Sequence, residues 1–207
     1  SLELVGRHTD ATSDFDGISE LTGLPVDDAN GDGTTDFYVT DVKQNYLRLG
    51  GRLDLLGGRW SHKLDYGITE TDTDTKSEGF FPDTRDFSST SGHKYGLYYQ
   101  TSLRVTADRE DQPGDVLTFA ADHEREEFRQ QAFSPFGDQA QDLDDTGVVA
   151  EYLAYLGPQL SLSASVRHDD YNQFEDATTW RTTASYGITA TGSRLHASLG
   201  TGQKTPT

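Results

Sequence analysis

Apolar and polar residues alternate along most of this chain. The segment Tyr46–Leu56 is the clearest case, because its leucines fall on every second position: Leu47, Leu49, Leu53 and Leu55. The intervening positions carry polar residues or glycine, including Arg48, Arg52 and Asp54. Successive side chains of a β-strand point to opposite faces, so the pattern predicts a strand with one apolar and one polar face. Trp60–Thr69 repeats it after Gly57-Gly58, a tight-turn signal.

The same alternation recurs often enough to predict nine strands of about ten residues and no helix. The other seven segments are Leu2–Thr9, Tyr95–Val105, Leu117–Asp122, Val148–Leu156, Leu160–Arg167, Trp180–Ile188 and Arg194–Leu199. We therefore expect an all-β fold.

Short and long connections follow one another strictly. The short ones include Gly57-Gly58, Leu156–Gln159 and Thr189–Ser193, with a somewhat longer Asp108–Asp115. The long ones, rich in Asp, Gly, Ser and Thr, are Ser13–Thr40, Asp72–Gly92 and Ala132–Asp145, and Asn172–Thr178 joins them by position. This order is typical of an antiparallel up-and-down barrel with tight turns on one rim and long loops on the other.

Alternation alone does not separate a membrane barrel from a soluble β-sandwich or a lipocalin-like barrel. Three features favour a membrane barrel. The strands are long enough to cross a bilayer when tilted, the polar faces carry charges in mid-strand, and the apolar faces carry aromatic residues near their ends. These aromatic residues are Trp60, Tyr66, Tyr95, Trp180 and Tyr186. No stretch approaches the roughly 18 consecutive apolar residues of a membrane helix. We therefore predict a segment of a transmembrane β-barrel that contacts lipid.

Composition supports this prediction and narrows the functions. Hydrophobic residues make up 33% of the 207 residues, yet aromatic residues reach 11%, as expected where apolar and polar faces alternate. The net charge of −18 argues against a nucleic-acid partner. The absence of cysteine excludes disulfides and zinc–thiolate sites. The chain contains no Met and begins within a strand pattern, so we expect it to be a fragment.

The C-terminal third carries a more specific signal. Leu160–Phe174 reads LSLSASVRHDDYNQF, Ala177–Tyr186 reads ATTWRTTASY, and Leu195–Thr207 ends in SLGTGQKTPT. These segments resemble the barrel of TonB-dependent outer-membrane receptors, although Gln203 stands where the family usually has an aromatic residue and Thr205 where it usually has Ala.

The resemblance implies that residues 1–207 are a partial receptor barrel, about nine of the family's 22 strands, without the plug domain and the remaining strands. It also implies the outer membrane of a Gram-negative bacterium, with short turns in the periplasm and long loops outside. The partners would be lipid, a small-molecule nutrient and a TonB-type energy-coupling protein that acts through the plug. No enzymatic activity is implied.

The order of hairpins and the compact loop with Asp169, Asp170 and Asn172 look most like the cobalamin (vitamin B12) receptor branch. Siderophore receptors share the same strand signature. The expected function is therefore uptake of a scarce nutrient such as cobalamin or a ferric siderophore. Two alternatives stay open: a passive porin-like or adhesin barrel, and a soluble extracellular calcium-binding β-protein.

One long connection has the spacing of a calcium loop. Asp27–Asp36 reads DDANGDGTTD and places candidate oxygen ligands at Asp28, Asn30, Asp32, Thr34 and Asp36, with Gly33 at the turn. Val39 stands where an EF-hand has its bidentate Glu, so Asp27 or Asp41 would complete the shell. The region Asp10–Asp41 holds nine acids and no Lys or Arg, and a cation would relieve their repulsion. We expect Ca²⁺ to order this loop.

Other candidate chemistry has simpler explanations. In Asp122–Glu127, the side chains of Asp122, Glu124 and Glu126 share one strand face and His123 points to the other, as in a strand that continues beyond the membrane. His168-Asp169 lacks a serine in a nucleophile elbow. Gly200–Thr205 lacks the spacing of a phosphate-binding loop. Arginines on the polar faces, such as Arg48, Arg52, Arg104, Arg167, Arg181 and Arg194, are expected to pair with lumen acids and a plug.

Overall fold

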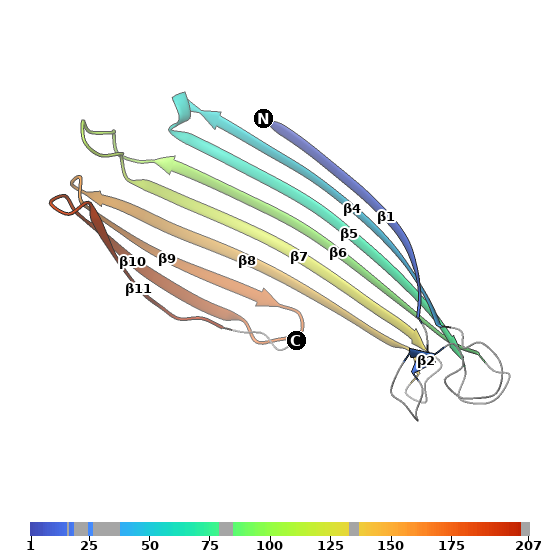
Figure 1. The fold of residues 1–207 in the computed structure, drawn as a ribbon. Helices are drawn as coiled ribbons and strands as arrows, with labels where there is room; N and C mark the ends of the chain where they lie inside the picture. The colour runs from blue at the N-terminus through green and yellow to red at the C-terminus, as the bar shows by residue number, and fades with distance from the viewer. Residues whose placement is uncertain (16, 19–24, 27–37, 79–84, 133–136, 204–207) are drawn as a thin grey trace.

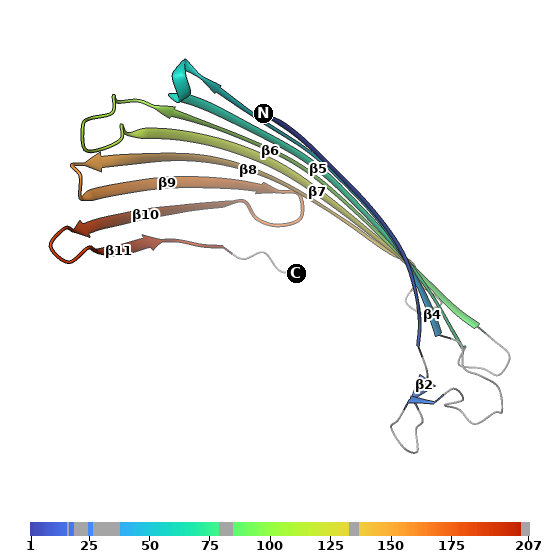
Figure 2. The ribbon, with the colours of Figure 1, turned by 45° about the horizontal axis from the view of Figure 1, so that its top comes forward.

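Nine antiparallel strands form one curved sheet in the computed structural model of the chain (Figures 1 and 2). The structure describes residues 1–15, 17–18, 25–26, 38–78, 85–132 and 137–203. The strands lie side by side in the order β1-β4-β5-β6-β7-β8-β9-β10-β11, with β1 and β11 at the two edges of an open sheet. The predicted number of strands and their up-and-down connection are confirmed, and the sheet has the form of a barrel segment rather than a closed barrel.

The strands of the sheet are β1 (Leu2–Asp14), β4 (Tyr38–Leu55), β5 (Trp60–Glu78), β6 (Arg85–Arg104), β7 (Val116–Ala132), β8 (Gln139–Leu156), β9 (Leu160–Tyr171), β10 (Ala177–Ile188) and β11 (Ser193–Gly200). Two short strands, β2 (Gly17–Ile18) and β3 (Pro25–Val26), pair with each other. A 3₁₀ turn, η1 (Leu56–Gly58), joins β4 to β5. Gly57 and Gly58 adopt φ values of 66° and 86° there, which confirms the predicted tight turn.

Strands β4 to β8 are longer than predicted. They contain 17 to 20 residues each, whereas the sequence predicted about ten. The predicted loop Asp72–Gly92 is therefore wrong over much of its length, because β5 continues to Glu78 and β6 begins at Arg85. The same correction applies to the ends of Ser13–Thr40 and Ala132–Asp145. The extensions are rich in Thr, Ser and Asp, so they pair without any apolar alternation.

Hydrogen bonds between strands hold these polar extensions together. Thr73 of β5 stands opposite Thr90 of β6, in a ladder that runs unbroken to Glu78 and Arg85. The Thr40 and Thr75 hydroxyls lie 3.2 Å apart across β4 and β5. Cross-strand threonine pairs of this kind stabilise a sheet by a few tenths of a kcal/mol, up to about 1 kcal/mol each. Strands β9, β10 and β11, with 12, 12 and 8 residues, lack comparable extensions.

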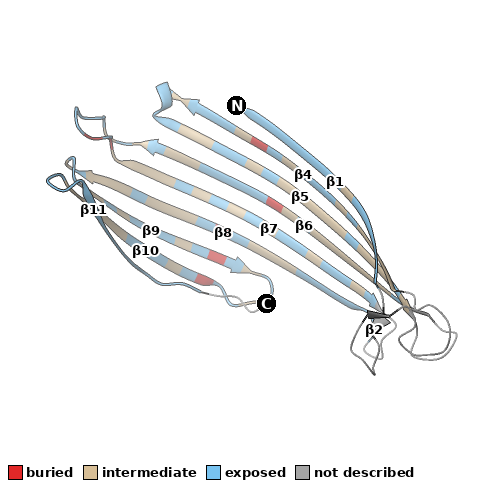
Figure 3. Cartoon of the chain, in the orientation of Figure 1, coloured by how far each residue is buried: buried red, intermediate tan, exposed pale blue. Residues whose placement is uncertain are grey.

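One face of the sheet carries a continuous apolar band. Register partners share a face, so the pairing places these side chains together: Leu2, Leu4, Leu47, Leu49, Leu53, Leu55, Trp60, Leu64, Tyr66, Ile68, Tyr95, Leu97, Tyr99, Leu103, Leu117, Phe119, Ala121, Val148, Ala150, Tyr152, Leu156, Leu160, Leu162, Val166, Trp180, Ala184, Tyr186, Leu195 and Leu199. Most of these large side chains are exposed (Figure 3). We call this set the apolar band.

The edge of the apolar band runs obliquely across the strands. Ile68 pairs with Tyr95 near this edge, but Tyr95 then pairs with Arg125, and Ala121 is the last residue of the apolar band in β7. The register continues from Ala121 through Val148 and His168 to Thr178 of β10, whereas the apolar band of β10 begins only at Trp180, opposite Val166. An oblique edge is expected where tilted strands cross a flat layer of lipid.

Almost no apolar side chain is buried. Ala177, 3% exposed, is the one buried hydrophobic residue in the described part of the chain. Leu4 is 70% exposed and Leu199 is 68% exposed. No second layer of described residues covers the apolar band. No described helix is long and apolar enough to cross a bilayer.

Candidate functional site

The opposite face, which we call the polar face, carries two charged networks beyond the apolar band. The first joins β6 to β7. The Lys94 Nζ lies 2.7 Å from a Glu124 carboxylate oxygen and 2.6 Å from one of Glu126. The Tyr98 hydroxyl donates a hydrogen bond to Glu124 as well. Gly96 lies between Lys94 and Tyr98 on the same face, and the Tyr98 ring occupies the space where a Cβ of residue 96 would stand.

Neighbouring groups shift the pKa of the Glu124 carboxylate in this network. Partial burial by itself would raise the pKa of Glu124, but the hydrogen bonds from Lys94 and Tyr98 outweigh burial, and the pKa lies below its ordinary value. The same contacts raise the pKa of Lys94, with Glu124 contributing most. Both groups therefore stay charged at neutral pH, and their ion pair bridges two strands.

The second network joins β7 to β9 across β8. The Arg167 guanidinium donates two hydrogen bonds of 2.9 Å to the two carboxylate oxygens of Asp122, and its Nε donates another of 2.7 Å to Asp169. Gly147 of β8 stands in register between Asp122 and Asp169. A Cβ at position 147 would lie 2.1 Å from the Arg167 Nη2, so any larger residue there would displace the guanidinium.

Asp145 lies beside this second network. Its Oδ1 is buried and has no hydrogen-bond donor among the described residues. Burial and the neighbouring charges of Asp169, Asp122 and Glu124 raise the pKa of Asp145, against the attraction of Arg167. A buried carboxylate oxygen without a donor is costly.

A hollow of about 900 Å³ lies over these residues. Its polar part includes Thr69, Thr71, Lys94, Glu124, Glu126 and Asp145. Its apolar part includes Phe128, Tyr171 and Phe174, and the rings of Tyr171 and Phe174 meet edge to face with centroids 6.2 Å apart. The hollow offers carboxylates, one ammonium group, hydroxyls and aromatic rings to a polar ligand or to another part of the protein.

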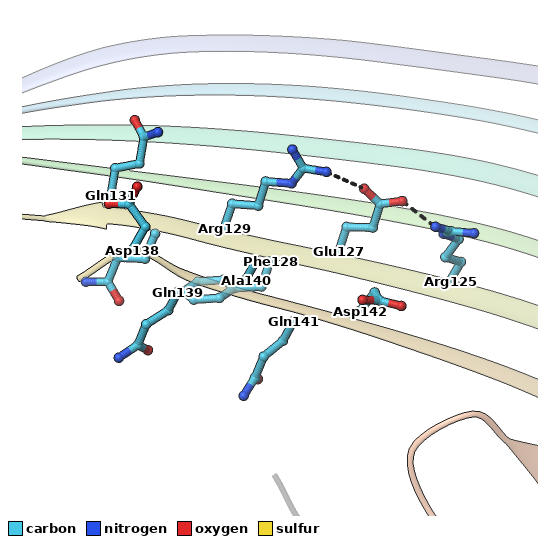
Figure 4. A pocket seen from close by; sticks show the side chains of 11 residues that line it. Arg125, Glu127, Phe128, Arg129, Gln131, Asp138, Gln139, Ala140, Gln141 and Asp142 are labelled. Carbon is cyan, nitrogen blue, oxygen red and sulfur yellow. Dashed lines mark hydrogen bonds and ion pairs between the residues drawn. The ribbon is translucent and has the colours of Figure 1, made fainter. Parts of the chain in front are cut away.

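A smaller hollow of about 380 Å³ lies at the ends of β7 and β8 (Figure 4). Glu127 stands between two arginines there, 2.9 Å from the Arg125 Nε and 3.9 Å from Arg129. Arg129 is 70% exposed, and ion pairs in such a position contribute little. We assign this hollow no binding role.

Most of the predicted calcium ligands, namely Asp27, Asp28, Asn30, Asp32, Thr34 and Asp36, lie outside the described residues. Asp41 lies in β4, where it accepts a 2.6 Å hydrogen bond from Thr12 and stands 3.8 Å from the Lys76 Nζ. Its carboxylate is thus already engaged between strands. No group of three or more His, Asp or Glu side chains in the described segments is arranged to hold a metal.

The predicted pairing of polar-face arginines with acids is confirmed for Arg48, Arg52, Arg104 and Arg167, whereas the described residues place no acid within ion-pair distance of Arg181 or Arg194. Arg48 donates hydrogen bonds to Asp65, which Lys63 also contacts at 3.2 Å. Arg167 pairs with acids as expected. His168 and Asp169 point to opposite faces, toward Thr178 and Arg167 respectively, so they form no catalytic pair.

The sequence did not single out Lys94, Tyr98 or Asp145. A usable signal was present for the first two. Lys94 and Tyr98 are four residues apart, so they share one face of β6. Glu124 and Glu126 are two residues apart, so they share one face of β7. Placing the two pairs together required the register, in which Gly96 stands opposite Glu124.

Comparison with known proteins gives two results. The family model described as "TonB dependent receptor-like, beta-barrel" matches residues 3–207. A solved structure entitled "Structure of the RagAB peptide transporter" superposes with a TM-score of 0.62 at 13% sequence identity. That similarity covers 96% of this chain and 31% of the other, so the chain spans less than a third of its length, and the low identity shows the fold alone. No curated protein matches the chain.

Proposed function

We propose that this chain, which belongs to the TonB-dependent receptor β-barrel family, is one part of an outer-membrane transporter of a Gram-negative bacterium. The observation that carries the proposal is the family match over residues 3–207 on a sheet with two unlike faces. The apolar band would contact lipid and the polar face would line the lumen. The two edge strands, β1 and β11, would pair with further strands of the barrel.

The transported molecule would be a scarce nutrient. The resemblance of the hairpin order and of the compact loop with Asp169, Asp170 and Asn172 to cobalamin receptors supports cobalamin first, with a ferric siderophore as the alternative. The RagAB protein is a peptide transporter, so oligopeptides belong in the same panel of candidate substrates. Uptake would draw on a TonB-type energy-coupling protein that acts through a plug domain.

The hollow on the polar face would serve as a contact surface inside the barrel. Lys94, Glu124 and Asp145 line it from three neighbouring strands. Their charges lie just beyond the apolar band, on the side of the long connections, where an incoming ligand or the plug would meet them. The donor-free oxygen of Asp145 would accept a hydrogen bond from a cationic or N–H group of such a partner.

Uptake by cells tests this function. A strain that lacks the full-length gene would be supplied with labelled cobalamin, ferric siderophores and oligopeptides, with and without the restored gene. We expect one substrate class to enter only with the gene, and uptake to stop when the energy-coupling protein is deleted. Uptake that persists without the coupling protein would instead support a passive porin-like channel. A purified protein that is folded and monomeric in buffer without detergent would support a soluble protein.

We also propose that the loop around Asp28, Asp32 and Asp36 binds Ca²⁺ outside the membrane. Its support is the spacing of oxygen-bearing residues around Gly33 and the excess of acids in Asp10–Asp41. Calorimetric titration of the purified full-length protein with calcium would show heat that a D28N/D32N double variant lacks. A K43Q variant, which changes a charge outside the loop, is the control. No calcium heat at millimolar concentrations for the parent protein would remove this proposal.

A further inference from the structure

Histidines gather on the lipid side of the sheet, at the edge of the apolar band nearest the long connections. His123 follows Ala121, the last band residue of β7, by two positions, and His168 follows Val166 of β9 by two. His93 stands two positions beyond Tyr95 of β6 on the same face. His8 of β1 shares this face as well, in register with Asn45. Four strands thus present an imidazole where the lipid-facing surface gives way to charged residues.

The two imidazoles on β7 and β9 are held in the same way. The His123 Nδ1 lies 2.9 Å from the Thr146 hydroxyl, and the His168 Nδ1 lies 2.9 Å from the Thr178 hydroxyl. In each pair the threonine belongs to the next strand. Both rings are exposed, so their Nε2 atoms are open to the surroundings of the barrel. When a threonine hydroxyl donates to Nδ1, the neutral ring carries its proton on Nε2 and can donate it outward.

We propose that His123 and His168 bind phosphate groups of membrane lipids through their Nε2–H. The site continues the lipid-facing apolar band, so the first polar groups it meets are lipid headgroups. A neutral N–H donor suits this position, because it binds phosphate oxygen without placing a full charge at the hydrocarbon edge.

The surrounding charges fix where the phosphate sits. Asp170 stands two residues beyond His168, and Asp144 lies beyond Thr146 on the same face. Arg125, two residues beyond His123, is occupied by Glu127 at 2.9 Å and lies 3.8 Å from Asp144. These acids repel phosphate from the water side, so the phosphate lies on the membrane side of them, level with the imidazoles. The inference depends on the apolar band facing lipid and not on which nutrient is transported.

Magnetic resonance of the full-length protein tests the contact directly. The protein would carry ¹⁵N-labelled histidine and be placed in phosphatidylglycerol bilayers, and ¹⁵N–³¹P dipolar dephasing would be recorded for each Nε2. His123→Gln and His168→Gln assign the two signals. We expect dephasing at both Nε2 atoms, together with ¹⁵N shifts that place the proton on Nε2. His196, on the polar face of β11, is the matched control and should show none.

A second sample separates lipid from free phosphate. It uses bilayers of a neutral, phosphate-free glycolipid with inorganic phosphate in the buffer, and we expect the dephasing to be lost. Dephasing that persists there would mean a free-phosphate site and would overturn the proposal. Absence of dephasing in phosphatidylglycerol, or equal dephasing at His196, would overturn it as well. Dephasing is recorded on the parent protein, and the variants serve only to assign the signals.

Discussion

Arg167 on β9 reaches across β8 to grip Asp122 on β7 with two parallel hydrogen bonds of 2.9 Å. The contact spans 45 residues of sequence and two strand intervals, and it passes directly over Gly147. Bidentate arginine–carboxylate pairs are the strongest of the common ion pairs and also fix geometry. This pair therefore connects β7 to β9 across β8 and fixes their relative register at the edge of the apolar band.

Substitution of Gly147 by alanine should break that lock. The new Cβ would stand 2.1 Å from the Arg167 guanidinium and 2.8 Å from the Asp122 carboxylate, so the ion pair must move. We expect the free energy of unfolding to fall by about 1–3 kcal/mol, measured by urea unfolding of the full-length protein in lipid vesicles.

Gly92→Ala is the matched control for this variant. Gly92 also lies on the polar face, in β6, but a Cβ there would meet nothing within 4 Å. A loss of stability in Gly92→Ala equal to that in Gly147→Ala would show that the effect comes from the strand backbone and not from the Arg167 contact.

Removal of the Lys94 charge should change the titration of Glu124. Without Lys94, the hydrogen bond from Tyr98 alone opposes the effect of burial, so Lys94→Met should raise the pKa of Glu124. Carbon-13 NMR of labelled glutamate side chains measures this shift. Lys43→Met, on the other face of the sheet, should leave it unchanged.

The same ion pair sets a pH dependence with a definite sign. The folded pKa of Glu124 lies below the unfolded value, so its contribution to stability is fully present above the ordinary carboxyl pKa and is lost as the pH falls through the folded pKa. The effect should be about 1 kcal/mol or less, because Lys94 is 45% exposed. Stability that is equally acid-sensitive in Lys94→Met and the parent protein would contradict it.

Asp145 should behave in the opposite way. Burial and neighbouring acids raise the pKa of Asp145, so the folded protein holds this proton more tightly than the unfolded chain. The cost is therefore absent below the ordinary carboxyl pKa and grows as the pH rises through the folded value. We expect Asp145→Asn to increase stability at pH 7, with a smaller gain at pH 4, in the same urea measurement.

If Asp145 contacts the ligand or the plug, that gain in stability should come with a loss of uptake. Asp72→Asn, in β5 on the opposite face of the sheet, is the control and should change neither quantity. A variant at position 145 that is more stable and transports normally would show that the carboxylate has no part in transport.

The hydrogen bonds of Asp115, which lies in the connection between β6 and β7, should hold this connection against β8 in a pH-dependent way. Its carboxylate accepts hydrogen bonds from the Tyr155 backbone N–H at 2.8 Å and from the Tyr152 hydroxyl at 2.9 Å. The first of these contributes most to lowering the pKa of Asp115. The protection factor of the Tyr155 amide in hydrogen exchange, which corrects for the pH dependence of the intrinsic rate, should be high at neutral pH and should drop as the pH falls through the lowered pKa, and Asp115→Ala should show little protection throughout. Strong protection in Asp115→Ala would contradict this account.

The sequence predicted the strands within the apolar band because one face is apolar and the other polar there, which produces strict alternation. Leu47–Leu55 and Trp60–Ile68 pair as the pattern and the Gly57-Gly58 turn indicated. Beyond the band both faces are polar, so segments such as Asp72–Glu78 show no apolar period and the sequence predicted a loop there. Strand pairing in that region rests on backbone hydrogen bonds and threonine contacts, which leave little trace in composition.

The polar networks were only partly predictable for a different reason. Arginines on the polar faces were expected to pair with acids, but the partner of Arg167 lies 45 residues away and depends on two successive registers. Asp145 could not be found from its neighbours in sequence, because Asp144 beside it faces the other side of the sheet. Its distinction is burial, which only the three-dimensional arrangement defines.

The strands of the sheet differ in length, so the rim on the side of the long connections is uneven. β6 has 20 residues and β10 has 12, and eight residues at about 3.3 Å each make a difference of about 26 Å along the strand. The barrel would therefore stand tall on the flank of β5 to β8 and low beside β9 to β11. A molecule that enters over the short strands β9 to β11 would then contact the polar face of the longer strands β5 to β8, where Lys94 and Glu124 lie.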